Sequence, residues 1–314
     1  MTCPLLLTKK SLKSILIVIK PRSGVYMEEY RTGRKVWGVL YPILLHFMIQ
    51  IAVSFTVVFV LVFAFYFKSG IEGLNEYMAS IDNNPNKYVM HISFISAVIS
   101  LPIFYSLFRR DIKKTTYYNN KIRYEQVPQY KFIYIFPLAV CACMGFSSLI
   151  SVAALYLPES FTNSYNQVSD ALSTGGIFIR ILILVLLVPI VEELVFRGLV
   201  YKRLTMIVHE NVAVIVSSLL FGVYHGNVLQ GLYAFILGCL MAFVYQKYKS
   251  IWAPVIFHMT ANGWSLYMEE LDTNSGFMDS ISALWAFMTV QIVIVILICI
   301  IIEKTVVVKV LSQE

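Results

Sequence analysis

Eight apolar runs, separated by short polar stretches, set the pattern of this chain between residues 39 and 302. A helix needs roughly 20 apolar residues to cross a bilayer. The first four runs and the last reach about that length, whereas the fifth is short and requires a broken or tilted helix. The pattern predicts an all-α, polytopic transmembrane helix bundle of about eight spanning helices, with seven spans as the alternative. The predicted spans are Val39–Phe67, Tyr88–Phe108, Phe132–Leu157, Ile177–Tyr201, Val212–Tyr224, Val228–Tyr245, Trp252–Tyr267 and Ala283–Ile302.

Composition agrees with the hydrophobic pattern. Hydrophobic residues make up 58% of the 314 residues and charged residues only 14%, against about a quarter charged in soluble domains. The mean hydropathy is +0.73. The net charge of +7 falls in a few loops between apolar runs, which is typical of membrane topology rather than of nucleic-acid binding.

The charged residues of the loops alternate along the chain. Lys and Arg gather before the first predicted span and after the second, fourth, sixth and eighth, whereas the opposite loops are acidic. Cytoplasmic loops of membrane proteins carry an excess of Lys and Arg. We therefore expect an integral, multi-pass protein of the plasma membrane with both termini on the cytoplasmic side.

The domain organisation follows from the same pattern. Residues 1–35 form a basic cytoplasmic segment in which Leu and Ile alternate with Lys, and either an interfacial helix on anionic lipid or a solvated tail fits it. Residues 36–310 are predicted to form a single transmembrane domain. The residues with catalytic potential cluster in a core at 177–270.

Three charged residues interrupt the fourth apolar run. Glu192, Glu193 and Arg197 stand where lipid favours Leu or Val, and each charge near a bilayer centre costs roughly 2.5–3.5 kcal/mol on insertion scales. Such residues normally face a bundle interior or a watery cavity. Glu193 and Arg197 are spaced i, i+4 and can pair on one helix face, which leaves Glu192 to face the other helices. Pro189, one turn earlier, removes one helix hydrogen bond and can kink the helix.

Two later runs each carry a histidine on a patterned face. Phe221 and His225 are spaced i, i+4 at the end of the fifth run, and His258 and Asn262 have the same spacing in the seventh. A lone histidine in an apolar helix is more often a packing residue, and His46 and His91 are interpreted in that way. The co-occurrence of carboxylates, imidazoles and a carboxamide between residues 192 and 262 predicts a polar catalytic cavity within the bilayer.

The order of these motifs resembles one family of intramembrane endopeptidases, the CAAX prenyl protease and bacteriocin-processing family (CPBP family). The resemblance covers roughly residues 177–270. The three motifs in this order are together a specific indication of the family, although any one of them alone is weak evidence. The matching residues are Glu192, Glu193 and Arg197 in Glu-Glu-x-x-x-Arg, Phe221 and His225 in Phe-x-x-x-His, and His258 and Asn262 in His-x-x-x-Asn.

The resemblance implies a hydrolytic mechanism near the cytoplasmic side of the membrane. Glu192, assisted by His225, would activate a water molecule that attacks a peptide carbonyl. His258 and Asn262 would stabilise the oxyanion. The supporting residues would be Phe221 and the orienting pair of Glu193 and Arg197.

The sequence is compatible with two kinds of site, one with a metal ion and one without any cofactor. Glu192, His225 and His258 could bind zinc or another divalent metal with water as a fourth ligand. The compact His-Glu-x-x-His signature is absent from the sequence, so a glutamate-activated water without any cofactor is the favoured alternative.

The predicted site requires the helices that carry Glu192 and His225 to bring these residues to the same depth in the membrane. Glu192 lies about 15 Å of helix from Lys202, whereas His225 lies about 21 Å from Asn211. We expect the fifth helix to tilt or begin deeper, so that Glu192 and His225 converge on one water-filled pocket.

The expected partners are a peptide or protein substrate, lipidated or membrane-embedded, and membrane lipids, but no nucleic acid. The sequence itself reveals no prenylated partner. A non-catalytic membrane immunity or scaffold protein that retains the cavity is the alternative, and a transporter that uses Glu192 as a proton relay is a third hypothesis.

Overall fold

The structure, a computed structural model, describes residues 32–84, 86–118, 123–124, 126–271, 280–308 and 310–311. These ranges are helical apart from short turns and two antiparallel two-residue strands, β1 (Arg123–Tyr124) and β2 (Val310–Leu311). The predicted all-α fold is confirmed. The helices are α2 (Thr32–Asn83), α3 (Val89–Tyr118), η1 (Gln129–Tyr134), α4 (Ile135–Ala154), α5 (Glu159–Leu172), α6 (Ile177–Arg180), η2 (Ile181–Leu187), α7 (Val188–Glu193), η3 (Leu194–Tyr201), α8 (Lys202–Leu204), α9 (Glu210–Tyr224), α10 (Val228–Tyr248), α11 (Trp252–Glu270) and α12 (Ile281–Thr305).

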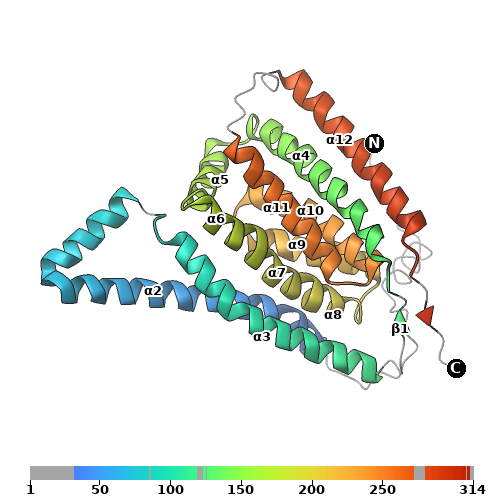
Figure 1. Cartoon of the computed structure of the whole chain (residues 1–314), viewed down its shortest axis with the longest axis horizontal. Coiled ribbons are helices and arrows are strands. Elements are labelled where there is room, and N and C mark those ends of the chain that lie inside the picture. The colour runs from blue at the N-terminus through green and yellow to red at the C-terminus, as the bar shows by residue number, and fades with distance from the viewer. Residues whose placement is uncertain are drawn as a thin grey trace, which may run out of the picture.

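The helices that carry the motifs form the centre of the bundle. The continuous helix α6–α8, with α9, α10 and α11, occupies the middle, and α4 and α12 cover one side (Figure 1). Helices α2 and α3 pack on the opposite side, against α6–α8, and extend well beyond the bundle at one end (Figure 1). The motif residues are therefore enclosed by other helices, whereas much of α2 is left to face lipid.

Helix α2 turns sharply after its apolar part. Ser69 and Gly70 leave the helical conformation, and Gly70 has a φ of 61°, a left-handed value that glycine adopts without a steric penalty. The segment after the turn folds back, so that the rings of Phe65 and Tyr77 lie 5.4 Å apart. The first predicted span, Val39–Phe67, ends at this break.

Five helices are long and apolar enough to cross a membrane, or six if the pair formed by α5 and α6–α8, bent by 109°, counts as one span. These criteria establish an integral membrane protein among the described residues, but they do not confirm the predicted count of eight. Helix α9 has only 15 residues, as the short fifth run indicated. Of the predicted N-terminal segment, residues 1–31 lie outside the described residues, and the division at residue 35 remains a prediction.

One end of the bundle, called the basic end here, is tied together by Arg203. Its guanidinium donates to Asp111 Oδ2 (2.6 Å), to the carbonyl oxygen of Gly38 (2.6 Å) and to the Tyr41 hydroxyl (2.9 Å). These bonds join α8 to α2 and α3. Because Arg203 is largely removed from solvent, this junction is worth more than a surface ion pair.

The opposite end, called the acidic end here, is tied together by Arg180. Its side chain is buried and pairs with Glu269 and Glu270 at the end of α11, and Ser173 also donates to Glu269 (2.6 Å). These contacts join the α5–α6 turn to α11. They explain why a basic residue stands among acidic loops.

Candidate active site

The helix that carries Glu192 changes its hydrogen-bond register around Pro189. Segments η2 and η3 are π-helical on either side of α7, and the Val188 N–H bonds to the carbonyl of Ile183, five residues back. In this wider register the donor for Leu184 would be residue 189, and proline has no N–H. The hydrogen bond that Pro189 is expected to remove is therefore the one to the Leu184 carbonyl, which has no backbone donor in this register. π-Helical turns are rare and often lie at functional sites.

Asn262 satisfies the carbonyl that Pro189 leaves free. Its Nδ2 donates to the Leu184 oxygen at 2.8 Å, across from α11 to η2. The sequence predicted Asn262 as an oxyanion donor. In the structure one amide hydrogen is committed to Leu184 and the second remains for another acceptor.

Glu193 and Arg197 form the predicted ion pair in a fully buried position. Arg197 Nη1 lies 2.7 Å from Glu193 Oε1, and the two side chains are 1% and 0% exposed. Arg197 Nη2 also donates to the carbonyl of Gly238 on α10 at 3.2 Å. A Cβ at Gly238 would lie 3.3 Å from that nitrogen, so glycine makes room for the guanidinium. A buried ion pair needs such additional hydrogen bonds; Arg197 has one, whereas Glu193 Oε2 has no hydrogen-bond partner in the described part of the chain.

His258 is oriented by the same carboxylate. Its Nδ1 lies 2.9 Å from Glu193 Oε1, and an ionised carboxylate can only accept, so Nδ1 carries the hydrogen. In the neutral imidazole, Nε2 then has a free lone pair. This nitrogen faces Glu192 Oε2 at 3.7 Å, which is too long for a hydrogen bond and is a separation that a water molecule can bridge.

His225 contacts the same Phe221 ring as His258. Both imidazoles contact that ring edge-on, His225 at 4.8 Å and His258 at 5.9 Å between centroids, and Arg197 lies 4.5 Å over it. His225 Nδ1 donates to the Phe221 carbonyl at 2.8 Å, which leaves Nε2 as an acceptor. Among the described residues no ion pair or hydrogen bond joins His225 to Glu192. The two groups are therefore not joined directly, and the assistance of His225 to Glu192 through a water molecule stays a prediction.

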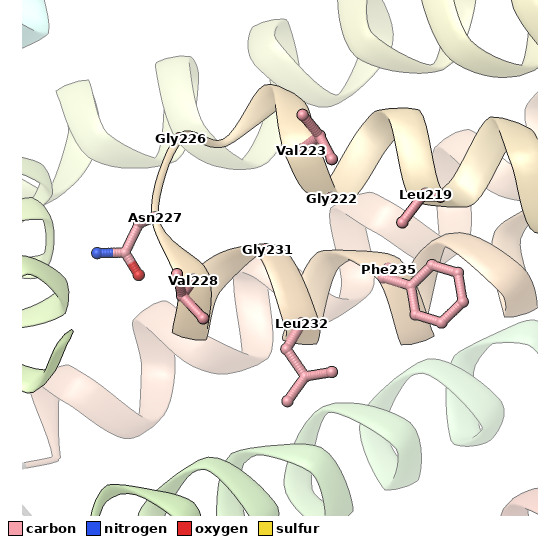
Figure 2. A pocket seen from close by; sticks show the side chains of 9 residues that line it. All are labelled: Leu219, Gly222, Val223, Gly226, Asn227, Val228, Gly231, Leu232 and Phe235. Carbon is pink, nitrogen blue, oxygen red and sulfur yellow. The ribbon is translucent and has the colours of Figure 1, made fainter. Parts of the chain in front are cut away.

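A groove of about 390 Å³ lies between α9 and α10, close to their connecting turn. Figure 2 shows Leu219 and Val223 of α9 opposite Leu232 and Phe235 of α10. Asn227 is the one polar side chain among its lining residues, and none of the predicted catalytic residues lines it. This apolar groove is thus distinct from the polar cavity predicted from the motifs.

The donor groups do not assemble the predicted metal site. Within the described parts of the chain, no three His, Cys, Asp or Glu side chains are grouped closely enough to hold a metal ion. Glu192 Oε2 and His258 Nε2 face one another, but His225 is not part of this group. A catalytic zinc site needs three protein ligands, so the residues as arranged do not fit one.

The structure thus brings together Glu192, Glu193, Arg197 and His258, and the Phe221 ring contacts both histidines. It also adds residues that the motif search missed. Gly238 gives no sequence signal. His46 and Gln50 do give a sequence signal, because they are two polar residues spaced i, i+4 within the first apolar run. Both bond to Tyr224, the residue before His225.

Comparison with known proteins agrees with the motif-based resemblance. Residues 174–264 match the family model described as type II CAAX prenyl endopeptidase, Rce1-like. The resemblance to this peptidase family is confirmed. This segment contains Glu192, His258 and the other motif residues, and it closes with the residues around Asn262.

One curated relative supports the same assignment. A Bacillus subtilis (strain 168) protein named "Putative membrane peptidase YdiL" is 31% identical over 81 residues, which cover 26% of this chain and 33% of the relative. The chain therefore spans about a third of the length of the curated relative it matches. No solved structure matches the chain.

Proposed function

We propose that this chain is an intramembrane endopeptidase in which Glu192 activates a water molecule held by His258. The observation that supports the proposal is the facing pair of Glu192 Oε2 and His258 Nε2 at 3.7 Å, inside the segment that matches a peptidase family. Glu193 fixes the imidazole tautomer that leaves Nε2 as an acceptor. A base and an acceptor converging on one water are the parts that general-base hydrolysis needs.

The reaction begins as the water oxygen attacks the carbonyl carbon of the scissile peptide bond. Glu192 takes one proton from that water, and the electron pair of the C=O bond moves onto oxygen to form the tetrahedral intermediate. When the intermediate collapses, the C–N bond breaks and Glu192 returns the proton to the leaving nitrogen. The buried pair of Glu193 and Arg197 keeps its charges throughout and holds His258 in place.

Asn262 and His225 have separate roles in this scheme. The amide hydrogen of Asn262 that is not bonded to Leu184 stabilises the oxyanion. His225, with Nδ1 fixed by the Phe221 carbonyl, accepts a hydrogen bond from the substrate through Nε2. This role differs from direct assistance to Glu192, which the sequence predicted.

The substrate is a peptide or protein that reaches the site from the membrane, lipidated or not, with lipids as the surrounding partner. The protein resides in the plasma membrane with its basic end on the cytoplasmic side. The substitutions Ser250→Cys, near the basic end, and Glu159→Cys, near the acidic end, test this orientation one at a time in a chain whose own five cysteines are replaced by Ser. An impermeant thiol reagent added to intact cells should label the second cysteine alone, and labelling of the first alone would reverse the assignment.

The test of function uses purified protein in detergent and a panel of quenched fluorescent peptides. The panel contains an S-farnesylated peptide with a C-terminal CAAX sequence, the same peptide without the lipid, and an apolar transmembrane peptide. Replacing Glu192 by Gln should lower the rate on any cleaved peptide by about 10²–10⁴, the usual contribution of a general base. The matched control is Glu159→Gln, the same change at an exposed position on α5.

Equal rates for wild type, Glu192→Gln and Glu159→Gln would reject the proposal. A Glu192→Gln variant that retains full biological activity would favour the non-catalytic scaffold or immunity protein. Chelation of the same sample, with metal analysis before and after, decides the cofactor. We expect the rate of peptide cleavage to be unchanged by chelation, because the described residues do not group three side chains that could bind a metal ion.

A further inference from the structure

A second polar cluster lies beside the site, and two of its three residues, His46 and Gln50, lie outside the matched segment. His46 and Gln50 of α2 both bond to the Tyr224 hydroxyl of α9, at 2.8 Å to His46 Nδ1 and 2.9 Å to Gln50 Oε1. His46 is only 4% exposed. Polar side chains inside membrane helices are expensive and are retained for function by default.

The direction of each bond in this cluster is determined by its chemistry. The Gln50 carboxamide oxygen can only accept, so Tyr224 donates its single hydroxyl hydrogen to it. The Tyr224 oxygen must then accept from His46 Nδ1, which fixes the hydrogen of the neutral imidazole on that nitrogen. The two bonds use the hydroxyl as donor and acceptor at once. They join α2 to the last residue of α9.

Ring packing adds to the hydrogen bonds. The rings of His46 and Tyr224 stack at 5.5 Å, and His46 also meets Phe104 of α3 edge-on. Tyr224 meets Phe196 of η3, the segment directly after Glu193, at 5.4 Å. The tyrosine therefore touches α2 on one side and the glutamate-bearing helix on the other.

Tyr224 is the residue directly before His225, and their rings are 6.4 Å apart. Helix α9 ends at Tyr224, and the chain then turns through Gly226, which has a φ of 68°. A helix end followed by such a turn is free to fray unless a contact holds it. Asn227 Nδ2 holds the far side of this turn through Ser164 Oγ at 2.8 Å, and the bonds from α2 hold the side that carries His225.

We propose that Tyr224, held by His46 and Gln50, is a positioning residue that fixes His225 for the reaction, so that the first transmembrane helix is part of the catalytic apparatus. This inference rests on the proposed function for its kinetic consequence. Its structural consequence, the fixed placement of His225, can be measured without any substrate.

The direct test replaces Tyr224 by Phe, which keeps the ring and removes both hydrogen bonds. The matched control is Tyr233→Phe on the neighbouring helix α10, whose hydroxyl donates to Cys143 Sγ at 3.1 Å and does not contact the motif residues. His225 carbethoxylation by diethyl pyrocarbonate is followed by mass spectrometry, with His209 at the start of α9 as the internal reference. We expect His225 to react about threefold to tenfold faster in Tyr224→Phe, where both bonds are lost and part of their net contribution is felt at His225, and at the wild-type rate in Tyr233→Phe.

Kinetics on a cleaved peptide give the second readout. Tyr224→Phe should lower kcat/KM by about threefold to tenfold, because the hydroxyl positions His225, which accepts a hydrogen bond from the substrate in the proposed scheme. His46→Leu should behave in the same way. His46→Asn should restore most of the rate, since its amide keeps an N–H donor close to the position of Nδ1.

Two results would overturn the inference. One is an equal His225 modification rate in Tyr224→Phe and Tyr233→Phe, and the other is equal kcat/KM values for His46→Leu and His46→Asn. If wild-type protein cleaves no peptide in the panel, the proposed function fails, and the modification rates alone decide the inference.

Discussion

Replacing Arg197 by Met is the sharpest test of how the site is held together. The change removes the cation but keeps an apolar side chain of similar length. It leaves the Glu193 carboxylate, which is fully buried, with His258 as its remaining partner, and Glu193 Oε2 already has no hydrogen-bond partner. Breaking a buried pair from one side costs about 3–5 kcal/mol, because the other charge is left uncompensated.

The double variant Glu193→Gln with Arg197→Met separates charge from packing. Removing both partners leaves no unpaired charge, so the double variant should be more stable than Arg197→Met alone. Each is measured by equilibrium unfolding in mixed micelles, followed by the reactivity of the thiols of Cys143 and Cys239, which become exposed on unfolding. Breaking a matched ion pair nearer the surface, Lys247 with Glu303, should lower the free energy of unfolding by at most about 1 kcal/mol.

The reasoning is refuted if Arg197→Met costs no more than the surface pair, or if the double variant is as unstable as the single one. Either result would mean that water reaches the pair. The proposal that the buried Glu193 carboxylate orients His258 would then be rejected.

Two further predictions follow from the contacts around the site. Asn262→Ala should leave the Leu184 carbonyl unpaired and cost about 1–3 kcal/mol of stability in the same unfolding assay, whereas a residue acting only on the oxyanion would lower kcat without a change in stability. In Gly238→Ala the new Cβ would lie 3.1 Å from Ser218 Cβ and 3.3 Å from Arg197 Nη2, so both neighbours must shift, and the change should lower both stability and rate. The control Gly263→Ala, whose Cβ would meet its nearest neighbour at an ordinary 3.5 Å, should change neither, and equal effects of the two alanines would contradict the close fit at Gly238.

Much of the site could be predicted because its signals are local. The pairing of Glu193 with Arg197 follows from i, i+4 spacing, and the structure has it at 2.7 Å. The separate role of Glu192 follows from its position one residue earlier on the same helix. The break after Phe67 agrees with the end of the first apolar run, and Gly70 supplies its conformation.

Other features could not be predicted because they depend on contacts between distant segments. The bond from Asn262 to Leu184 exists because η2 adopts a π register, and no periodicity in the sequence indicates that register. The room that Gly238 leaves for Arg197 appears only when α10 lies against η3. The role of His46 depends on Tyr224, 178 residues away.

The sequence by itself determined that this chain enters a membrane and which polar groups it carries there, because hydrophobic length and the cost of a buried charge are properties of a local stretch. Only the tertiary structure decided which histidine faces Glu192. That choice depends on the rotation and depth of each helix, which are set by packing against its neighbours. The same packing placed His225 beside Phe221 and brought the first helix into contact with the site.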